Sequence, residues 1–269
     1  MNPLSPIGIL VSSTRRTVEF IGDVGYLLAD TAAATAAALF GKRGRRSGWT
    51  NLFTQMDRVG VQSIPIVSLV AFCIGAILAL QMAPILKQYG MVPKVADVIS
   101  LAIFRELGPL MAAIVLTGFA GASIAAEMGT TVVSEEIEAL NAHAIDPIRY
   151  LVVPRIMATA IMLICVTVMA DLLGVLGGLV VGQFLLGITH QQYTAHTFAA
   201  LQMRDFVTGL IKAAVFGLII STLACYLGLR VTGGAQGVGR ATTRTVVLTI
   251  VSLIAVDLIF NAVFYFLGW

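Results

Sequence analysis

Five long apolar runs alternate with short polar segments along the chain. They cover residues 61–82, 99–126, 156–182, 206–229 and 245–267. The hydrocarbon core of a bilayer is about 30 Å thick and needs about 20 helical residues to cross it. Each run reaches this length. The pattern therefore predicts an all-α membrane protein with five transmembrane helices.

The composition supports a membrane protein and excludes a nucleic-acid binder. Hydrophobic residues make up 58% of the chain, the mean hydropathy is +0.93, and only 12% of residues are charged. That charged share is about half the share in soluble domains. A net charge of +3 without a basic stripe argues against nucleic-acid binding. Cys73, Cys165 and Cys225 lie inside apolar runs without metal-ligand spacing, so we expect buried thiols and no metal site.

The basic residues predict the orientation of the five helices. Most of the 17 Lys and Arg residues lie in residues 1–60, in the segment between the second and third runs, and in the segment between the fourth and fifth. Loops rich in Lys and Arg stay in the cytoplasm. We therefore expect a cytoplasmic N-terminus and a C-terminus on the outer side, which is the periplasm in a bacterial inner membrane.

The first 58 residues are expected to form a segment separate from the transmembrane domain at 59–269. Residues 17–40 mix carboxylates with apolar side chains, and the cationic stretch 41–46 follows them. This arrangement is typical of an amphipathic helix in the membrane interface, with its basic residues near anionic headgroups. A helix packed on the cytoplasmic side is the alternative.

A short acidic helix is predicted between the second and third runs. Ser134 is a suitable N-cap residue, and Glu135 and Glu136 in the first turn favour the helix dipole. Ile137 and Leu140 fall on one face of such a helix. The segment is either a solvated connector or a helix that docks into a groove of a partner.

Three ionisable residues lie inside the apolar runs at matching depth. Arg105 and Glu106 lie in the second run, and Lys212 lies in the fourth. With about 1.5 Å of rise per residue, all three lie roughly 10 Å below the outer boundary. Charges in a membrane face cavities, partners or water. They therefore pair with one another, reach back to the interface, or surround an outward-facing cavity that meets a lipid headgroup.

Carboxylates occur at two further depths. Asp171 and Asp257 lie near the middle of the third and fifth runs. Each is either bonded to Ser, Thr or Asn of a neighbouring helix or part of a proton relay. Glu127 ends the second run and is expected to accept bonds from Arg149 or Arg155.

Glycine spacing predicts close helix packing in the third run. Gly174, Gly177, Gly178 and Gly182 lie along one side, and small faces let membrane helices approach closely. Large apolar residues of the first run are candidates either for the wall of a lipid channel or for lipid-facing surface. These are Leu69, Phe72, Ile77, Leu80 and Met82.

The chain contains no phosphate-binding loop of the form G-x-x-x-x-G-K-[ST]. The glycine-rich segment 230–244 also lacks G-x-G-x-x-G. We expect it to be a turn that presents Arg240 and Arg244 to lipid phosphates or to an ATPase. If ATP drives this protein, another polypeptide binds the nucleotide.

Several motifs in order resemble one family of membrane proteins. The segment RELGPLMAAIVLTGFAGASIAAEMGTTVVSEEIEAL (105–140), the segment AIDPIRYLVVPR (144–155), the segment LIKAAVF (210–216) and the segment GVGRATTRTVV (237–247) resemble MlaE-type permeases. These are membrane subunits of ABC transporters that work with MCE proteins. The resemblance runs from about residue 50 to the C-terminus. Family members often have Gly-Arg where this chain has Gly118-Phe119.

The resemblance implies a lipid transporter of the bacterial inner membrane, usually for phospholipid. It implies a homodimer of permease chains, two ATPase subunits that bind ATP and Mg²⁺, and an MCE hexamer on the outer side. Some systems add a STAS-domain subunit. The chain itself would be non-catalytic and carry no cofactor.

The resemblance also implies that the acidic helix is the coupling helix on the ATPase. Its residues are Ser134, Glu135, Glu136, Ile137, Glu138, Ala139 and Leu140. The competing hypotheses are a proton-coupled secondary transporter that uses Asp171 and Asp257, and a membrane scaffold without a substrate. Secondary transporters usually contain inverted repeats, and none is visible in this sequence.

Overall fold

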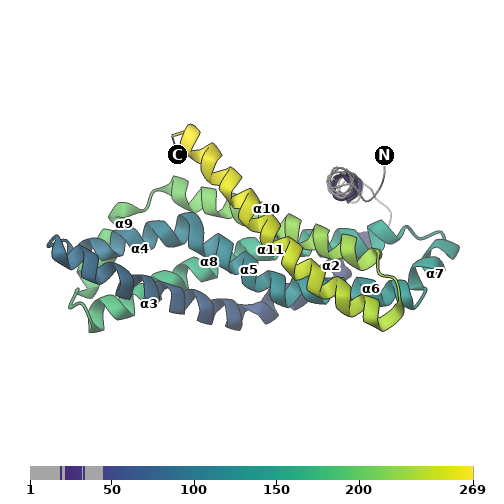
Figure 1. Cartoon of the computed structure of the whole chain (residues 1–269), viewed down its shortest axis with the longest axis horizontal. Helices are drawn as coiled ribbons and strands as arrows, with labels where there is room; N and C mark the ends of the chain where they lie inside the picture. The colour runs from purple at the N-terminus through teal and green to yellow at the C-terminus, as the bar shows by residue number, and fades with distance from the viewer. Residues whose placement is uncertain (1–18, 20–21, 32, 34–44, 269) are drawn as a thin grey trace, which may run out of the picture.

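The computed structural model describes residues 19, 22–31, 33 and 45–268, and these residues form an elongated bundle of helices (Figure 1). No strand occurs in this described part. Five helical segments are long and apolar enough to cross a membrane. They are Thr50–Gln88, Val92–Val133, Ile148–Phe184, Met203–Leu229 and Gly234–Phe266. The predicted all-α fold with five spans is confirmed, and each helical segment is longer than its apolar run.

The first two spans are both interrupted helices. In the second, two π-helical turns divide the α-helix into three parts, and Pro109 follows the first of these turns. Proline lacks an N–H and cannot complete the α-helical hydrogen-bond pattern. The elements are α2 (Arg45–Val59), η1 (Val61–Ser63), α3 (Ile64–Gln88), η2 (Val92–Lys94), α4 (Val95–Ala102), η3 (Ile103–Leu107), α5 (Gly108–Leu116), η4 (Thr117–Gly121) and α6 (Ala122–Val133).

The remaining elements comprise three long, unbroken helices and three short ones. A short helix between the third and fourth spans begins with a capping box, in which Thr189 and Gln192 bond each other's backbone N–H. The elements are α7 (Glu136–Ala142), η5 (Ile148–Val152), α8 (Val153–Phe184), α9 (His190–Ala200), α10 (Met203–Leu229) and α11 (Gly234–Phe266).

The segment 230–244 is mostly helical, and the expectation of a long glycine-rich turn there was wrong. Helix α10 ends at Leu229 and α11 begins at Gly234. Gly233 has a φ of 87°, a conformation that glycine adopts without a steric penalty. Gly234 is also left-handed, with a φ of 65°. Two adjacent glycines therefore reverse the chain, and the residues after them continue as helix.

Helices α3 and α8 pack backbone against backbone. A Cβ atom added to Gly75 would collide with the carbonyl oxygen of Gly174, and one added to Gly177 would collide with that of Phe72. The predicted close packing of the third span is confirmed, and its partner is the first span. Small or β-branched residues at every fourth position of α3 are buried. They are Val67, Ala71, Gly75, Ala79 and Ala83.

Helix α10 occupies the interior of the bundle, whereas α11 lies on its surface. In the apolar membrane-spanning stretch of α10, 67% of the residues are buried, whereas in that of α11 only 17% are buried. Phe216 and Ile220 of α10 are fully buried beside Leu116 and Leu163 of the second and third spans. Figure 1 shows α11 crossing the bundle diagonally, with its C-terminal end projecting from it.

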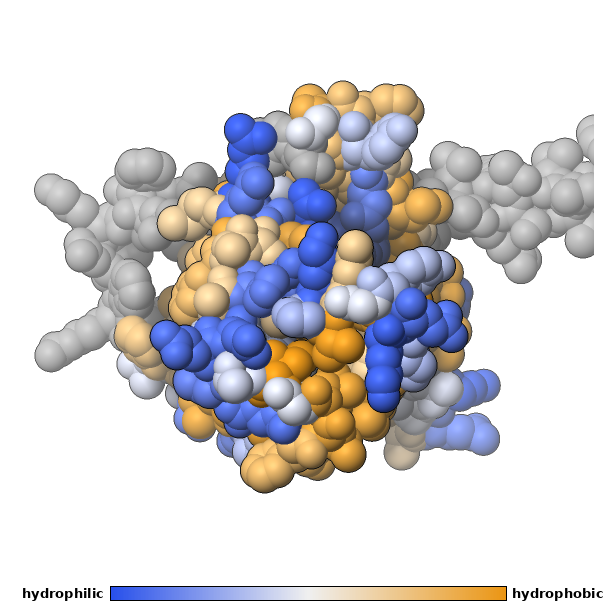
Figure 2. Space-filling model, turned by 90° about the vertical axis from the view of Figure 1, so that its left-hand side faces the viewer, coloured by the Kyte–Doolittle hydropathy of each residue, from blue (hydrophilic) through white to orange (hydrophobic). Residues whose placement is uncertain are grey.

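The two ends of the bundle are named here by the short helices that lie there. Helix α7 marks the α7 end and α9 marks the α9 end, at opposite ends of the long axis (Figure 1). Figure 2 looks onto the α9 end, where hydrophilic side chains gather, while the flanks are largely apolar. This distribution suits a long axis that crosses the membrane.

The cysteines differ in exposure. Cys225 is buried, but Cys73 and Cys165 are exposed, so the expectation of buried thiols was wrong for two of the three. The reason is that an apolar run in a membrane protein also supplies the outer surface that contacts lipid.

Only part of the predicted N-terminal interfacial helix falls within the described residues. Residues 22–31 are helical, and Asp23 in this segment accepts hydrogen bonds from Tyr226 and Arg230 at the end of α10. Most of residues 1–44 lies outside the described residues. The expected domain boundary at residue 58 falls at the end of α2.

Candidate functional site

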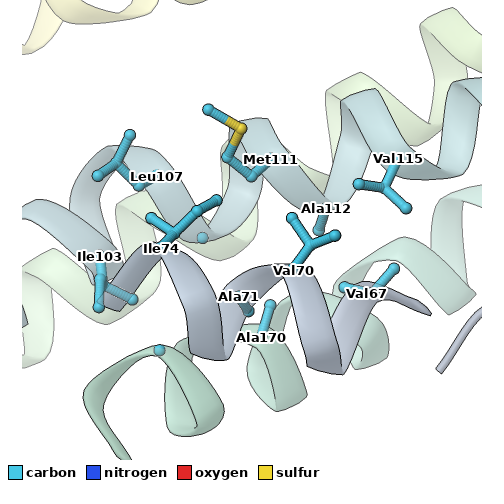
Figure 3. Close-up of a pocket in the computed structure, with 12 residues that line it drawn as sticks. Val67, Val70, Ala71, Ile74, Ile103, Leu107, Met111, Ala112, Val115 and Ala170 are labelled. Carbon is cyan, nitrogen blue, oxygen red and sulfur yellow. The ribbon is translucent and has the colours of Figure 1, made fainter. Parts of the chain in front are cut away.

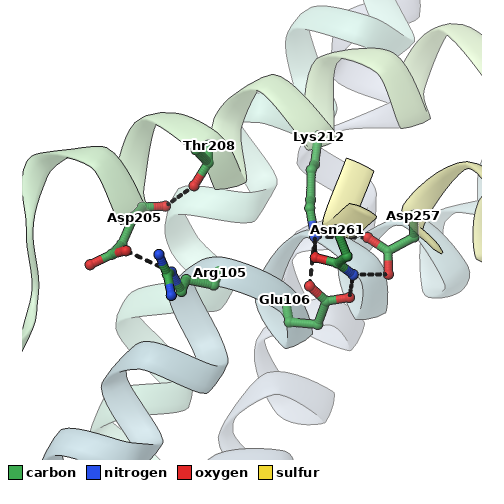
Figure 4. Close-up of polar contacts among 7 residues, drawn as sticks. All are labelled: Arg105, Glu106, Asp205, Thr208, Lys212, Asp257 and Asn261. Carbon is green, nitrogen blue, oxygen red and sulfur yellow. Dashed lines mark hydrogen bonds and ion pairs between the residues drawn. The ribbon is translucent and has the colours of Figure 1, made fainter. Parts of the chain in front are cut away.

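Lys212 is the centre of a buried polar network between three spans. Its side chain is 1% exposed. The Nζ atom donates to Glu106 Oε2 at 2.6 Å and to Asn261 Oδ1 at 2.9 Å, and lies 2.9 Å from Asp257 Oδ1 (Figure 4). An ammonium group has three N–H donors, and it has three oxygen partners here. The charge of Lys212 is therefore fully compensated inside the protein.

The secondary structure brings these four residues together. Glu106 lies on the π-helical turn η3, and Lys212 lies on α10. Asp257 and Asn261 lie one turn apart on α11. Asn261 Nδ2 donates to Glu106 Oε1 at 2.9 Å and to Asp257 Oδ2 at 3.3 Å. We call these four residues the Lys212 network; its two carboxylates and one ammonium give it a formal charge of −1.

Arg105 lies outside this network, although it is adjacent to Glu106 in the sequence. Its Nε atom lies 2.7 Å from Asp205 Oδ1 (Figure 4). Asp205 also accepts a hydrogen bond from the backbone N–H of Gln202, at the start of α10, at 2.9 Å. The structure thus pairs Glu106 with Lys212, as the matching depths suggested, and pairs Arg105 with a residue that sequence analysis missed.

The three predicted headgroup residues differ in accessibility. The side chains of Arg105 and Glu106 are 48% and 31% exposed, in contrast to the buried Lys212. A ligand at this position would therefore meet Arg105 and Glu106, while Lys212 holds Glu106 from behind.

Asp171 and Asp257 have different environments. Asp257 is bonded to Asn261, which lies on its own helix rather than on a neighbouring one as we had expected. Asp171 is 1% exposed, and within the described part of the chain its Oδ1 has no hydrogen-bond partner. This oxygen lies directly against Gly108, where an added Cβ would collide with it.

A second polar network surrounds Glu127 toward the α7 end. Glu127 Oε2 accepts a hydrogen bond from Arg155 at 3.2 Å, and Glu127 Oε1 lies 2.5 Å from Arg58 Nη1. Ser123 donates to Glu127 Oε1 at 3.2 Å. We call Arg58, Ser123, Glu127 and Arg155 the Glu127 network; its formal charge is +1. The predicted bond from Arg155 is confirmed.

Arg149 does not reach Glu127. It lies 3.4 Å from Asp146, three residues earlier in the chain. Arg58 takes the second place beside Glu127, and sequence analysis had not linked it to that residue. Arg58 lies on α2, too far from Glu127 in the sequence for helical spacing to predict the contact.

The short helix between the second and third spans begins one residue later than we expected. It covers Glu136–Ala142, and Ser134 is the C-cap of α6 rather than the N-cap of α7. Ser134 is drawn into the end of α6 because that helix continues to Val133. Glu135 then reverses the chain with a φ of 60°, so Glu136 and Glu138, not Glu135, form the first acidic turn.

Helix α7 has one face toward the protein and one toward solvent. Ile137 and Leu140 are half-buried, whereas Glu136, Glu138 and Ala139 are exposed. The expected common face of Ile137 and Leu140 is therefore present, and the exposed acidic face is open to a partner.

The apolar candidates of the first span point mainly outward from the chain. Leu69, Ile77 and Leu80 are exposed, and Phe72 is half-buried. The narrow apolar crevice between α3, α5 and α8 is lined by other residues (Figure 3). These include Val67, Val70, Ala71, Ile74, Leu107 and Met111.

Comparison with known proteins gives one family match over most of the chain. The family model described as Permease MlaE matches residues 52–263, which include both polar networks and α7. A probable ABC transporter permease protein of Rickettsia felis is 36% identical over 260 residues, covering 96% of this chain and 98% of the relative.

Two further relatives carry more specific names. The intermembrane phospholipid transport system permease protein MlaE of Haemophilus influenzae is 29% identical over 94% of this chain and 96% of its own length. The chloroplastic protein TRIGALACTOSYLDIACYLGLYCEROL 1 of Arabidopsis thaliana is 33% identical over 81% of this chain and 62% of its own length.

Proposed function

The chain belongs to the MlaE permease family, and from this premise we propose that it is the membrane subunit of an ATP-driven transporter of phospholipid. The name of the Haemophilus relative supports the substrate class. The observation that carries the proposal is the Lys212 network, because a cluster of charges inside a span is costly and marks a functional position.

The accessible part of this site suits a zwitterionic or anionic headgroup. The carboxylate of Glu106 is positioned to accept a headgroup ammonium or hydroxyl, and the half-exposed guanidinium of Arg105 to bind a phosphate. Lys212 fixes the position of Glu106 without contacting the ligand. Leu69, Phe72, Ile77 and Leu80 are proposed to contact acyl chains, in a cavity completed by a second copy of the chain.

The α7 helix is proposed to transmit the movement of the ATPase. Its exposed residues Glu136, Glu138 and Ala139 would fit a groove of that subunit, while Ile137 and Leu140 attach the helix to the permease. ATP and Mg²⁺ would bind on the ATPase, so the permease itself would have no catalytic role. Closure of two ATPases would move both α7 helices and change the volume of the lipid cavity.

The proposed assembly lies in the bacterial inner membrane. The α7 end and the N-terminus would face the cytoplasm, and the α9 end and the C-terminus would face the periplasm, as the distribution of basic residues predicts. A homodimer, two ATPases and an MCE hexamer at the α9 end complete the transporter, with a STAS-domain subunit where one is present.

Lipid transport by the reconstituted complex tests the role of Glu106. We expect Glu106→Gln to reduce transport of a fluorescent phospholipid at least about tenfold, which corresponds to losing about 1.4 kcal/mol of interaction with the headgroup. The matched control is Asp57→Asn, which changes the same charge on an exposed position of α2. Normal assembly and normal transport in Glu106→Gln would contradict the proposal.

A charge reversal tests the coupling role of α7. We expect Glu136→Lys together with Glu138→Lys to abolish co-purification of the ATPase while the permease still folds. If the ATPase remains bound with wild-type affinity, α7 is not its docking helix.

A proton-coupled secondary transporter is the alternative, and the same vesicles distinguish it. The buried, unpartnered oxygen of Asp171 is the observation in its favour, whereas Asp257 is held by Lys212. Lipid movement driven by a pH gradient without an ATPase, and its loss in Asp171→Asn, would support this alternative.

A further inference from the structure

Three arginines line one cleft at the turn between α10 and α11. Arg230 follows the last residue of α10, and Arg240 and Arg244 lie one turn apart on α11. Their cleft is also lined by Tyr226 and by two carboxylates of the N-terminal helical segment, Glu19 and Asp23. Because positions four apart on a helix share a face, Arg240 and Arg244 present their guanidinium groups on the same side.

Arg230 is held in place, but the other two arginines are available. Arg230 donates to Asp23 Oδ2 at 2.6 Å and lies 4.7 Å from the centroid of the Tyr226 ring. Arg240 and Arg244 are exposed, and neither forms an ion pair with a carboxylate of the described residues. The cleft thus combines one anchored guanidinium with two that no carboxylate in the described part of the chain pairs with.

The position of the cleft matches the depth of lipid phosphates. The turn between α10 and α11 lies toward the α7 end of the bundle (Figure 1). Arg244 directly precedes the apolar run that starts at residue 245. A basic residue at such a boundary lies where the hydrocarbon core meets the headgroups, and planar guanidinium groups bind phosphate oxygens in pairs.

We propose that this cleft binds a phosphate ester, and specifically the phosphate of an anionic phospholipid in the leaflet at the α7 end. Asp23 places a carboxylate against Arg230 and Tyr226, and therefore competes with the lipid phosphate for the same donors. The site is separate from the Lys212 network and does not depend on whether the chain transports lipid.

Photo-crosslinking tests the proposal directly. The full chain in its native assembly is placed in phosphatidylcholine nanodiscs that contain phosphatidylglycerol with a photoreactive headgroup, and crosslinks are mapped by mass spectrometry. We expect labelling of the peptide that spans residues 226–244. Replacing Arg240 and Arg244 together by Gln should lower this labelling at least about fivefold, the contribution of one interfacial basic residue.

Arg149→Gln is the matched control. Arg149 is also an exposed arginine toward the α7 end, but it pairs with Asp146 and does not line the cleft. Its replacement should leave labelling of 226–244 unchanged. Equal labelling in the double variant and in this control would overturn the proposal. So would loss of ATPase binding in the double variant with unchanged labelling, because the arginines would then serve protein docking.

Two further measurements separate the source of the phosphate and the role of Asp23. Labelling that persists in excess inorganic phosphate, at ionic strength matched with chloride, assigns the site to lipid; labelling lost only with phosphate assigns it to a soluble phosphate ester. Asp23→Asn should increase labelling, because it removes the competing charge. A decrease in that variant would overturn the competition between Asp23 and the lipid.

Discussion

The Lys212 network and the Glu127 network both neutralise an ion between helices, but the central ion has the opposite charge in each. Each joins helices from different spans through one central ion. The Lys212 network surrounds a buried ammonium with two carboxylates, whereas the Glu127 network surrounds one carboxylate with two guanidinium groups. Lys212 is 1% exposed, but Arg58 in the other network is half-exposed.

This difference in exposure indicates which network loses more stability when one of its charged members is removed. Arg58 is half-exposed, so water can replace a lost partner there. The Lys212 ammonium is buried, and a charge that loses its counter-ions in a low-dielectric interior retains its full desolvation cost. Substitutions in the Lys212 network should therefore cost more stability than matched substitutions in the Glu127 network.

Removing the central cation should have the largest effect. Lys212→Met keeps the length of the side chain but leaves Glu106 and Asp257 without their counter-ion. We expect the free energy of unfolding to fall by about 3–5 kcal/mol. Thermal unfolding of the purified chain in nanodiscs measures this. Adding Glu106→Gln should recover part of the loss, and an unchanged melting temperature in Lys212→Met would refute the comparison.

The two arginines of the Glu127 network should differ from each other. The Arg155 side chain is 10% exposed and also donates to the Leu151 carbonyl, so Arg155→Gln should cost about 2 kcal/mol. Arg58→Gln removes a half-exposed partner and should cost less than about 1 kcal/mol. The same unfolding assay compares the two; equal costs would show that exposure does not control the value of these ion pairs.

A substitution in the seam between α3 and α8 separates packing from charge. Neither network includes a residue of α3. Gly75→Ala would force a Cβ against the backbone of Gly174 and should cost about 1–3 kcal/mol. Gly118→Ala is the control, since nothing lies within 4 Å of its Cβ position. The loss in Gly75→Ala should not change with salt concentration; a salt-dependent loss would point to disturbed ion pairs instead.

A small effect is also expected for the neutral member of the Lys212 network. Asn261→Ala removes hydrogen bonds to Glu106, Lys212 and Asp257 but leaves both charge pairs intact. We expect a loss of about 1 kcal/mol, because hydrogen bonds are lost while both carboxylate counter-ions of Lys212 remain. A loss as large as that of Lys212→Met would mean that the amide, not the charge balance, holds the network together.

Hydropathy predicted the five spans, and matching depth predicted the Glu106–Lys212 pair. The separation of Arg105 from Glu106 could not be predicted. The π-helical turn that carries both residues and the one at Thr117–Gly121 change the phase of the second span. A fixed period of 3.6 residues therefore gives the wrong direction for side chains on either side of them.

Other misses have equally local causes. Ser134 is a good N-cap residue, but helix α6 continues to Val133, so Ser134 is the C-cap of that helix. Leu69 and Ile77 are apolar whether they face a cavity or lipid, so composition could not place them. Asn261 could have been found, because it lies four residues after Asp257 and thus on the same face of α11.

The meshed glycines of α3 and α8 also constrain how this protein can change shape. Where the main chains of two helices are in contact, no flexible side chains lie between them to accommodate sliding. We therefore expect α3 and α8 to move as one rigid unit. A conformational change that opens the bundle must then separate helices other than α3 and α8. Helix α11 lies on the surface of the bundle, and it is the element that we expect to move against this unit.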